Sequence, residues 1–251
     1  MANHSLMKPH LLISNDDSIT SPFLPIFAEE MAKVADIDIV VPDTEKSWIG
    51  RAYARHSDIE VKEIDFLGFR TYVVSGTPSD CVNIALGHLL KDVDVVVSGL
   101  NIGQNIAMPL LWSSGTFAAA VEGAGWLVPS MSFSMRLENR YYESIRINHS
   151  LADKNLSQTI RYASKKSAEF VIENYKKLKN REVFNVNFPA KYSEDTPIIE
   201  CVPAKAKLQS LYTKSEGKFK FKYSFSKEDT GELTDYDCLE NNKACFSKIS
   251  I

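Results

Sequence analysis

Short apolar runs in the first half of the chain alternate with stretches whose apolar residues recur at helical spacing. Five of these runs are predicted to be strands, at residues 11–13, 36–41, 70–74, 92–98 and 128–133. Helices are predicted to begin near residues 22, 77 and 114, where proline, serine or threonine occupies a typical first-turn position. The alternation of strand and helix predicts right-handed βαβ units and an α/β fold with a mostly parallel sheet.

The second half of the chain has a less regular pattern. No element is assigned to the polar stretch 136–157, whereas residues 158–180 are predicted to form a long amphipathic helix. Residues 182–189 are a predicted strand that ends at a proline, and residues 198–225 are predicted strands or a hairpin. Phenylalanine and lysine alternate within residues 219–223, which predicts a half-buried strand whose lysines protect a sheet edge. A last short strand is predicted at the carboxyl terminus.

Composition limits the class of protein. The chain has 251 residues, of which 44% are hydrophobic and 24% charged, as is ordinary for one large globular domain or two small ones. A net charge of −3 gives no electrostatic reason to expect a nucleic acid duplex or an anionic membrane as partner. No apolar run is long enough to cross a bilayer, and the start lacks the apolar core of a signal peptide. The cysteines are scattered without a CxxC pair, which favours reduced thiols in a cytoplasmic protein over disulfides or a zinc site: Cys81, Cys201, Cys238 and Cys245.

Two adjacent carboxylates, Asp16 and Asp17, follow the first predicted strand. Like charges disfavour each other's ionised form, and a cation offsets that cost. Ligands of open α/β sheets bind outside the carboxyl ends of the strands, which is where this pair lies. The pair is therefore predicted to hold a divalent metal ion. The alternative is that the two acids cap the next helix and favour its positive end.

Polar side chains also follow two further strands. Ser47 lies in a polar loop after the second strand, from which it could reach the same metal, or it belongs to an ordinary solvated loop. Asn101 and Asn105 lie in the stretch SGLNIGQN after the predicted central strand. Amide oxygens are reasonable ligands for a hard cation, although asparagine and glycine are also common in turns.

The stretch Ser114-Gly115-Thr116 begins a predicted helix. Free backbone N–H groups, two hydroxyls and the positive end of the helix dipole together make a physical anion site. The alternative is that Ser114 is a helix cap and nothing more. The stretch therefore indicates either a phosphate site or an ordinary helix start.

Four motifs in this order resemble the SurE family of survival-protein phosphatases, which are 5′/3′-nucleotidases: SNDD, GTPSDCV, VVSGLNIGQN, and SGT followed by AAAVEG. The later FNVNFP also matches, so the resemblance covers residues 11–133 strongly and 182–189 moderately. It implies a Rossmann-like sheet sandwiched by helices. It also implies hydrolysis of nucleoside 5′- or 3′-monophosphates to nucleoside and phosphate by a metal-activated water.

The resemblance further implies one divalent cation per subunit, Mg²⁺ or Mn²⁺, with Asp16 and Asp17 as the catalytic pair. The metal ligands it implies are Asp16, Asp17, Ser47 and Asn101, and the phosphate-binding residues are Asn105, Ser114, Gly115 and Thr116. Family members form dimers or tetramers with exchanged carboxyl-terminal arms. Here residues 1–204 would be the core and residues 205–251 a hairpin or arm used in oligomerisation.

Five positions depart from the family pattern: Ser18, Thr44, Trp48, Ala107 and Ser113. They put loop shape and leaving-group preference in question and leave open a catalytically degraded member that only binds nucleotides. A receiver-like signalling module is a weaker alternative, because its central strand would end in a phosphoacceptor aspartate and this one ends in Ser98-Gly99. A dinucleotide-binding oxidoreductase is weaker still, because no GxGxxG follows the first strand.

Overall fold

The apolar runs of the first half form the centre of a nine-stranded sheet in the computed structural model, which describes residues 8–149 and 151–251. β1 (His10–Ser14) lies between β2 (Asp36–Pro42) and β5 (Val95–Ile102) and pairs in parallel with both. The strand order is β3-β4-β2-β1-β5-β6-β7-β13-β8. The remaining strands are β3 (Val61–Phe66), β4 (Phe69–Val74), β6 (Ser130–Met135), β7 (Glu182–Phe188), β8 (Ile198–Glu200) and β13 (Ala244–Ser250). Only β3 with β4 and β13 with β7 pair antiparallel within this sheet, so the predicted mostly parallel α/β fold is confirmed.

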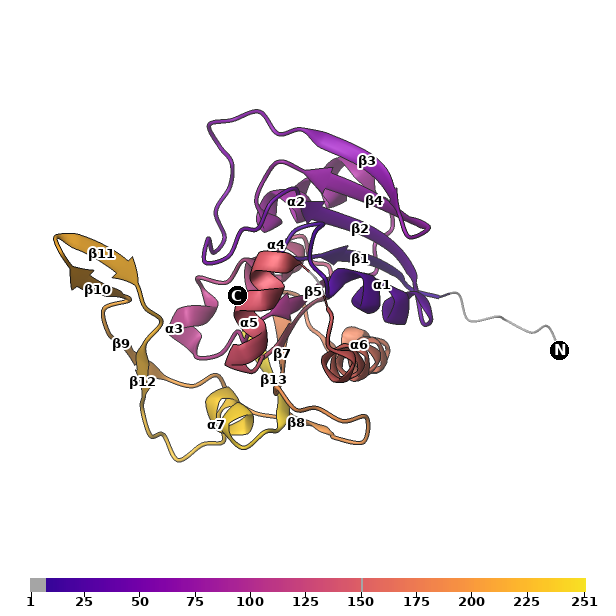
Figure 1. Cartoon of the computed structure of the whole chain (residues 1–251). Coiled ribbons are helices and arrows are strands. Elements are labelled where there is room, and N and C mark those ends of the chain that lie inside the picture. Colours follow the sequence, from indigo (N-terminus) through magenta and orange to yellow (C-terminus); the bar gives the residue numbers. More distant parts are fainter. Residues whose placement is uncertain (1–7, 150) are drawn as a thin grey trace.

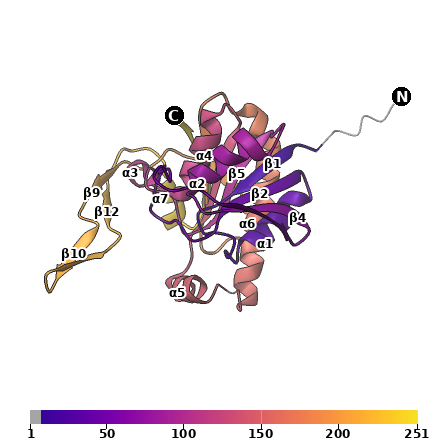
Figure 2. The same cartoon turned by 90° about the horizontal axis from the view of Figure 1, so that it is seen from above.

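Helices cover both faces of the sheet, as Figure 2 shows. Because side chains alternate along a strand, Leu11 and Ile13 of β1 face one side and Leu12 faces the other. α1 (Leu24–Ala32) and α6 (Lys154–Asn174) pack on the first side, and α2 (Pro78–Ile84) and α4 (Gly115–Gly125) pack on the second. The carboxyl ends of β1, β2 and β5 therefore open at one edge of this sandwich.

The helix starts agree with the sequence in part. Thr77 caps α2 and forms a capping box with Asp80, as its position before Pro78 predicts. α1 begins at Leu24, after the predicted proline at residue 22, and carries a different proline in its first turn. α6 begins earlier than predicted because Asp153 caps it, accepting the N–H groups of two following residues. α3 (Met108–Leu111), α5 (Asn139–Asn148), a π-helical turn (Ala85–Leu89) and a 3-10 turn (Tyr175–Lys177) complete the amino-terminal three quarters.

β5 extends further than its sequence predicts. The stretch after Ser98 was expected to leave the sheet, but the strand continues to Ile102 with a register shift against β6 between Ser98 and Asn101. Gly99 permits this bulge, because its φ is +144° and an added Cβ would lie 2.5 Å from the carbonyl oxygen of Phe133. Asn101 therefore lies on a strand, and the turn interpretation is wrong for this residue.

The carboxyl-terminal segment leaves the sheet and returns to it (Figure 1). β9 (Ala206–Leu208) pairs with β12 (Phe225–Lys227), and the hairpin of β10 (Tyr212–Ser215) and β11 (Lys218–Phe221) projects beyond them. All four residues of β11 are exposed, so the prediction of a half-buried strand there is wrong.

α7 (Asp235–Glu240) then packs against the main sheet, and β13 inserts between β7 and β8. The last part of the predicted arm thus lies within the sheet, while the division at residue 204 stays a prediction. Across the described ranges, no helix has both the length and the apolar character needed to cross a membrane.

Candidate metal and phosphate site

Asp16 joins three elements at the carboxyl edge of the sheet. It follows β1, is 4% exposed, and its Oδ1 accepts a hydrogen bond of 2.6 Å from Oγ1 of Thr116 at the start of α4. Its carbonyl oxygen accepts the N–H of Lys46, at 2.7 Å, from the loop after β2. The residue that caps α1 is Phe23, without a side-chain hydrogen bond, so the alternative in which the acids cap the next helix is wrong.

Gly115 allows α4 to approach Asp16 closely. An added Cβ at this glycine would lie 2.7 Å from Cβ of Asp16, 3.0 Å from its Oδ2 and 3.0 Å from the carbonyl oxygen of Lys46. Any larger residue has to displace the aspartate or the loop. The glycine of the Ser-Gly-Thr motif is thus required for the placement of Asp16.

Asp17 is tied to the end of β5. Its Oδ2 accepts the N–H of Ile102 at 2.8 Å. Ile102 directly follows Asn101, so this bond ties Asp17 to the backbone next to Asn101. The Asn101 side chain is buried, and its Nδ2 donates to the carbonyl oxygen of Gly103 at 3.2 Å. Because the amide nitrogen makes that bond, the amide oxygen is the atom that remains for a hard cation.

The pKa values of both aspartates are raised. Burial raises the pKa of Asp16 from 3.8 to about 6, against the lowering effect of its hydrogen bond with Thr116. Burial and the neighbouring charge of Asp16 raise the pKa of Asp17 well above its usual range. Within residues 8–149 and 151–251, the ion pairs involve other carboxylates and neither of these two. The buried carboxylate of Asp16 and the half-buried one of Asp17, beside an amide oxygen, fit a hard divalent cation, which would favour their ionised form.

Glu45 is a third acid near the pair, which the sequence analysis did not identify. Its charge raises the pKa of both aspartates. Its Oε1 accepts a hydrogen bond of 2.6 Å from Oγ of Ser47. The exposed Ser47 hydroxyl is therefore engaged with Glu45, and its role as a metal ligand stays a prediction. The sequence feature that could have identified Glu45 is its position in the same loop, two residues before Ser47.

The hydroxyls of the Ser-Gly-Thr motif have local partners. Oγ of Ser114 accepts the N–H of Phe117 at 3.0 Å, so this serine is the cap of α4, as the alternative interpretation holds. The Thr116 hydroxyl donates to Asp16 and thereby orients it. A cap that accepts one bond can still donate its own hydrogen to an anion. A phosphate-binding role for these residues stays a prediction.

Two buried asparagines of β7 hold the backbone of Asn105. Nδ2 of Asn185 and Nδ2 of Asn187 both donate to its carbonyl oxygen at 2.9 Å, and its N–H donates to Oδ1 of Asn187 at 2.9 Å. The Asn105 side chain donates to Oγ of Ser134 at 2.8 Å. These asparagines belong to the FNVNFP motif, for which the sequence predicted no role at the site. The sequence feature that could have identified them is the presence of two amide side chains on the same face of an otherwise apolar strand.

Glu122 fixes the loop after β2 to α4 and was also missed. It is buried, and its Oε2 accepts bonds from Arg51 at 3.0 and 2.7 Å and one from the Tyr53 hydroxyl. Its Oε1 accepts bonds from Nδ2 of Asn83 at 2.8 Å and Nε1 of Trp126 at 3.2 Å. Every oxygen of this buried carboxylate is therefore partnered, and the loop that carries Lys46 and Ser47 is held in place. The sequence feature that could have identified Glu122 is a single glutamate within an alanine-rich helix.

Comparison with known proteins identifies the family. The model of the family described as survival protein SurE matches residues 11–210. The chain is 40% identical over 134 residues to a 5′-nucleotidase SurE from Methanoculleus marisnigri, which covers 53% of this chain and 51% of that protein. It is 35% identical over 182 residues to a 5′-nucleotidase SurE from Clostridium beijerinckii, which covers 72% of this chain and 66% of that protein.

A solved structure, the SurE protein from Aquifex aeolicus, shares the fold. The two superpose with a TM-score of 0.72 at 24% sequence identity, covering 96% of this chain and 93% of the other. The aligned sequence spans only about half to two thirds of the length of the two relatives named above. The comparisons therefore give the family and the fold, and the activity has to be argued from the site.

Proposed function

The chain belongs to the SurE family, and we propose that it is a divalent-metal-dependent phosphomonoesterase that hydrolyses nucleoside 5′- or 3′-monophosphates to nucleoside and phosphate. The observation that carries this proposal is the pair Asp16 and Asp17, which lies beside the start of α4 and forms no ion pair within the described residues. A cation site beside a helix N-terminus suits a phosphate monoester, because the cation and the N–H groups of the helix N-terminus can both bind its anionic oxygens.

Asp16, Asp17, Asn101 and Ser47 would hold the cation, and Mg²⁺ or Mn²⁺ fits their oxygen donors. When bound, the cation supplies a Lewis acid that polarises a phosphoryl oxygen and lowers the pKa of water. Glu45 lies near enough to raise the pKa of both aspartates, so it adds negative charge that favours cation binding.

The start of α4 would bind and orient the phosphate. The N–H groups of the first turn and the hydroxyl of Ser114 would donate to phosphoryl oxygens, where negative charge is concentrated. Thr116 would act through Asp16, whose carboxylate it orients. Asn105, held by the two asparagines of β7, would offer its amide to the same phosphate after releasing Ser134.

Trp48 and the carboxyl-terminal segment would shape the substrate entrance. The Trp48 ring packs edge-on against Phe221 and Tyr223, with ring centroids 4.8 and 5.6 Å apart. Because Trp48 follows Ser47 directly, this contact links the hairpin of β10 and β11 to the loop at the metal site. The aromatic cluster would take the base of a nucleotide by stacking.

The same segment would serve in a homodimer or homotetramer. Its hairpin projects from the sheet and exposes apolar rings, with Phe219 66% exposed and Tyr212 55% exposed. Exposed apolar patches of this kind mark interaction surfaces. Sedimentation velocity of the chain with and without residues 209–224 tests this assembly, and a monomer in both cases would contradict it. The cytoplasmic location stays a prediction.

The direct experiment is phosphate release from a panel of nucleoside 5′- and 3′-monophosphates, with EDTA, Mg²⁺ or Mn²⁺. We expect release that requires the cation, and the panel ranks base and position. Folded protein that binds nucleotides but releases no phosphate with any cation would contradict the enzyme proposal. It would favour a nucleotide-binding member of the family and direct attention to Ser18, Trp48 and Ser113.

A further inference from the structure

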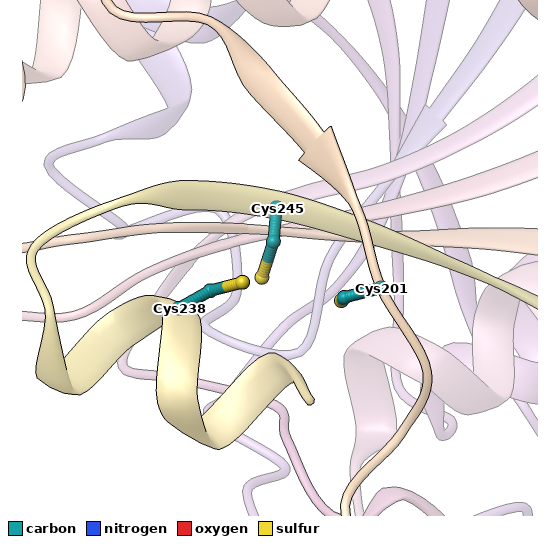
Figure 3. Close-up of side chains that lie close together, drawn as sticks. All are labelled: Cys201, Cys238 and Cys245. Atoms are coloured by element: carbon teal, nitrogen blue, oxygen red, sulfur yellow. The ribbon is translucent and has the colours of Figure 1, made fainter. Parts of the chain in front are cut away.

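Three cysteines that are far apart in the sequence meet where α7 packs beside β13 and the end of β8 (Figure 3). Cys201 follows β8, Cys238 lies in α7 and Cys245 lies in β13, and their sulfur atoms are all within 4.8 Å of one another. All three side chains are buried. The cysteines that are scattered in the sequence are therefore brought together in the fold at these three positions, whereas the expectation of reduced thiols without a zinc site stays a prediction.

The surroundings of the sulfurs distinguish this cluster from ordinary buried thiols. A lone buried cysteine usually packs as a small apolar residue against aliphatic side chains. Here the three residues form a separate cluster made of cysteines alone. Figure 3 shows the sulfurs of Cys238 and Cys245 pointing toward each other and that of Cys201 pointing toward the same space.

We propose that Cys201, Cys238 and Cys245 bind one thiophilic d¹⁰ metal ion, Zn²⁺ or Cu⁺, through three thiolates. A metal at about 2.3 Å from each sulfur requires sulfur separations of about 3.8–4.0 Å. The side chains therefore have to close by no more than about 1 Å. Soft thiolates select these ions over Mg²⁺ and Mn²⁺, which prefer oxygen donors.

The site would join the three elements that complete the sheet edge. Cys201 lies at the end of β8, and its Sγ donates at 3.4 Å to the carbonyl oxygen of Phe246 in β13. Sγ of Cys245 donates at 3.9 Å to the carbonyl oxygen of Asp235 in α7. Metal binding replaces these weak thiol donors with metal–sulfur bonds and releases the thiol protons, so affinity rises with pH.

The experiment uses the full chain, purified anaerobically with a non-thiol reductant and stripped of metal by a chelator. Titration with Co²⁺ reports the site through sulfur-to-cobalt charge-transfer absorption, which carboxylates such as Asp16 cannot produce. Addition of Zn²⁺ or Cu⁺ then displaces Co²⁺ from the sulfurs, and the loss of the charge-transfer band identifies which ion the thiolate site retains. This readout is independent of phosphate release, so it separates this proposal from the proposed nucleotidase activity.

Two variants serve as matched tests. Cys245→Ser removes a ligand, whereas Cys81→Ala removes the buried cysteine that lies outside the cluster, in α2. We expect one equivalent of metal with the charge-transfer band in wild type and in Cys81→Ala, and at least about a tenfold loss of affinity in Cys245→Ser. Should Cys245→Ser fail to fold, the band and its stoichiometry in wild type decide the question. Folded wild-type protein without the band, or an unchanged band in Cys245→Ser, would overturn the proposal.

Discussion

Gly115→Ala tests the packing on which the site depends. The added Cβ would lie 2.7 Å from Cβ of Asp16 and 3.0 Å from the carbonyl oxygen of Lys46. Non-bonded carbon atoms settle about 3.5–4.0 Å apart, so Asp16 or the start of α4 has to move by on the order of 1 Å. Misplacement on this scale is expected to lower turnover about 100-fold. The overpacking costs about 1–3 kcal/mol, which the helix propensity of alanine offsets by up to about 1 kcal/mol.

Gly125→Ala is the matched control in the same helix, because its added Cβ would meet only Nη2 of Arg51, at 3.7 Å. The assay is kcat/KM for phosphate release with Mn²⁺ titrated for each variant, together with thermal unfolding. We expect Gly115→Ala to stay folded, to require more Mn²⁺ and to turn over far more slowly than Gly125→Ala. Equal kcat/KM for the two variants would refute the reasoning.

Three further substitutions probe the contacts around the site. Glu122→Gln removes the charge that holds the loop after β2, and should cost about 1 kcal/mol and weaken turnover. Asn187→Asp loses the donor to the Asn105 carbonyl, and should lower turnover on the order of tenfold with an unchanged fold. Burial would raise the pKa of Asp38, but hydrogen bonds from Arg70 at 2.6 and 2.5 Å hold it below its usual range. The ionised Asp38 carboxylate therefore stabilises the fold above about pH 4, and this stabilisation is lost as the pH falls through the folded-state pKa of Asp38. Asp38→Asn should cost about 1–2 kcal/mol at pH 7, and this cost should shrink as the pH falls below the unfolded-state pKa.

Each of these three has a distinct measurement. Thermal unfolding and Mn²⁺-dependent turnover measure Glu122→Gln, and wild-type values for both would contradict the anchoring role. Circular dichroism and turnover measure Asn187→Asp, for which undiminished kcat would be the contrary result. A series of melting curves from pH 7 into acid measures Asp38→Asn, and a stability loss that does not shrink as the pH falls would show that packing and not charge is responsible.

Local patterns predicted the part of the fold that local physics determines. The runs around Leu12 and Val40 read as strands because they are continuous and buried on both faces. Thr77-Pro78 and Ser114-Gly115 read as helix starts because capping depends on a few neighbouring residues. The order of the motifs carried the family assignment, which the comparisons confirm.

Features that depend on residues far apart in the chain could not be predicted from local sequence patterns. β5 continues past Gly99 because β6 pairs with its bulged end. A glycine taken by itself predicts a turn, so the sequence placed the end of this strand too early. β13 enters between β7 and β8 through pairings that no local pattern contains. The three-cysteine cluster is assembled by the same insertion, so wide spacing concealed it. Glu45 and Glu122 act through loop packing, which residue type alone does not reveal.

The measurement that tests the central claim most directly is the cation dependence of phosphate release in wild type and in Asp16→Asn. Asn keeps the shape of the side chain but removes the charge that a divalent cation requires. We predict release with Mg²⁺ or Mn²⁺, none with EDTA, and a loss of at least about 100-fold in a folded Asp16→Asn. Release that persists in EDTA, or wild-type turnover in Asp16→Asn, would contradict the assignment of Asp16 and Asp17 as the metal-binding pair.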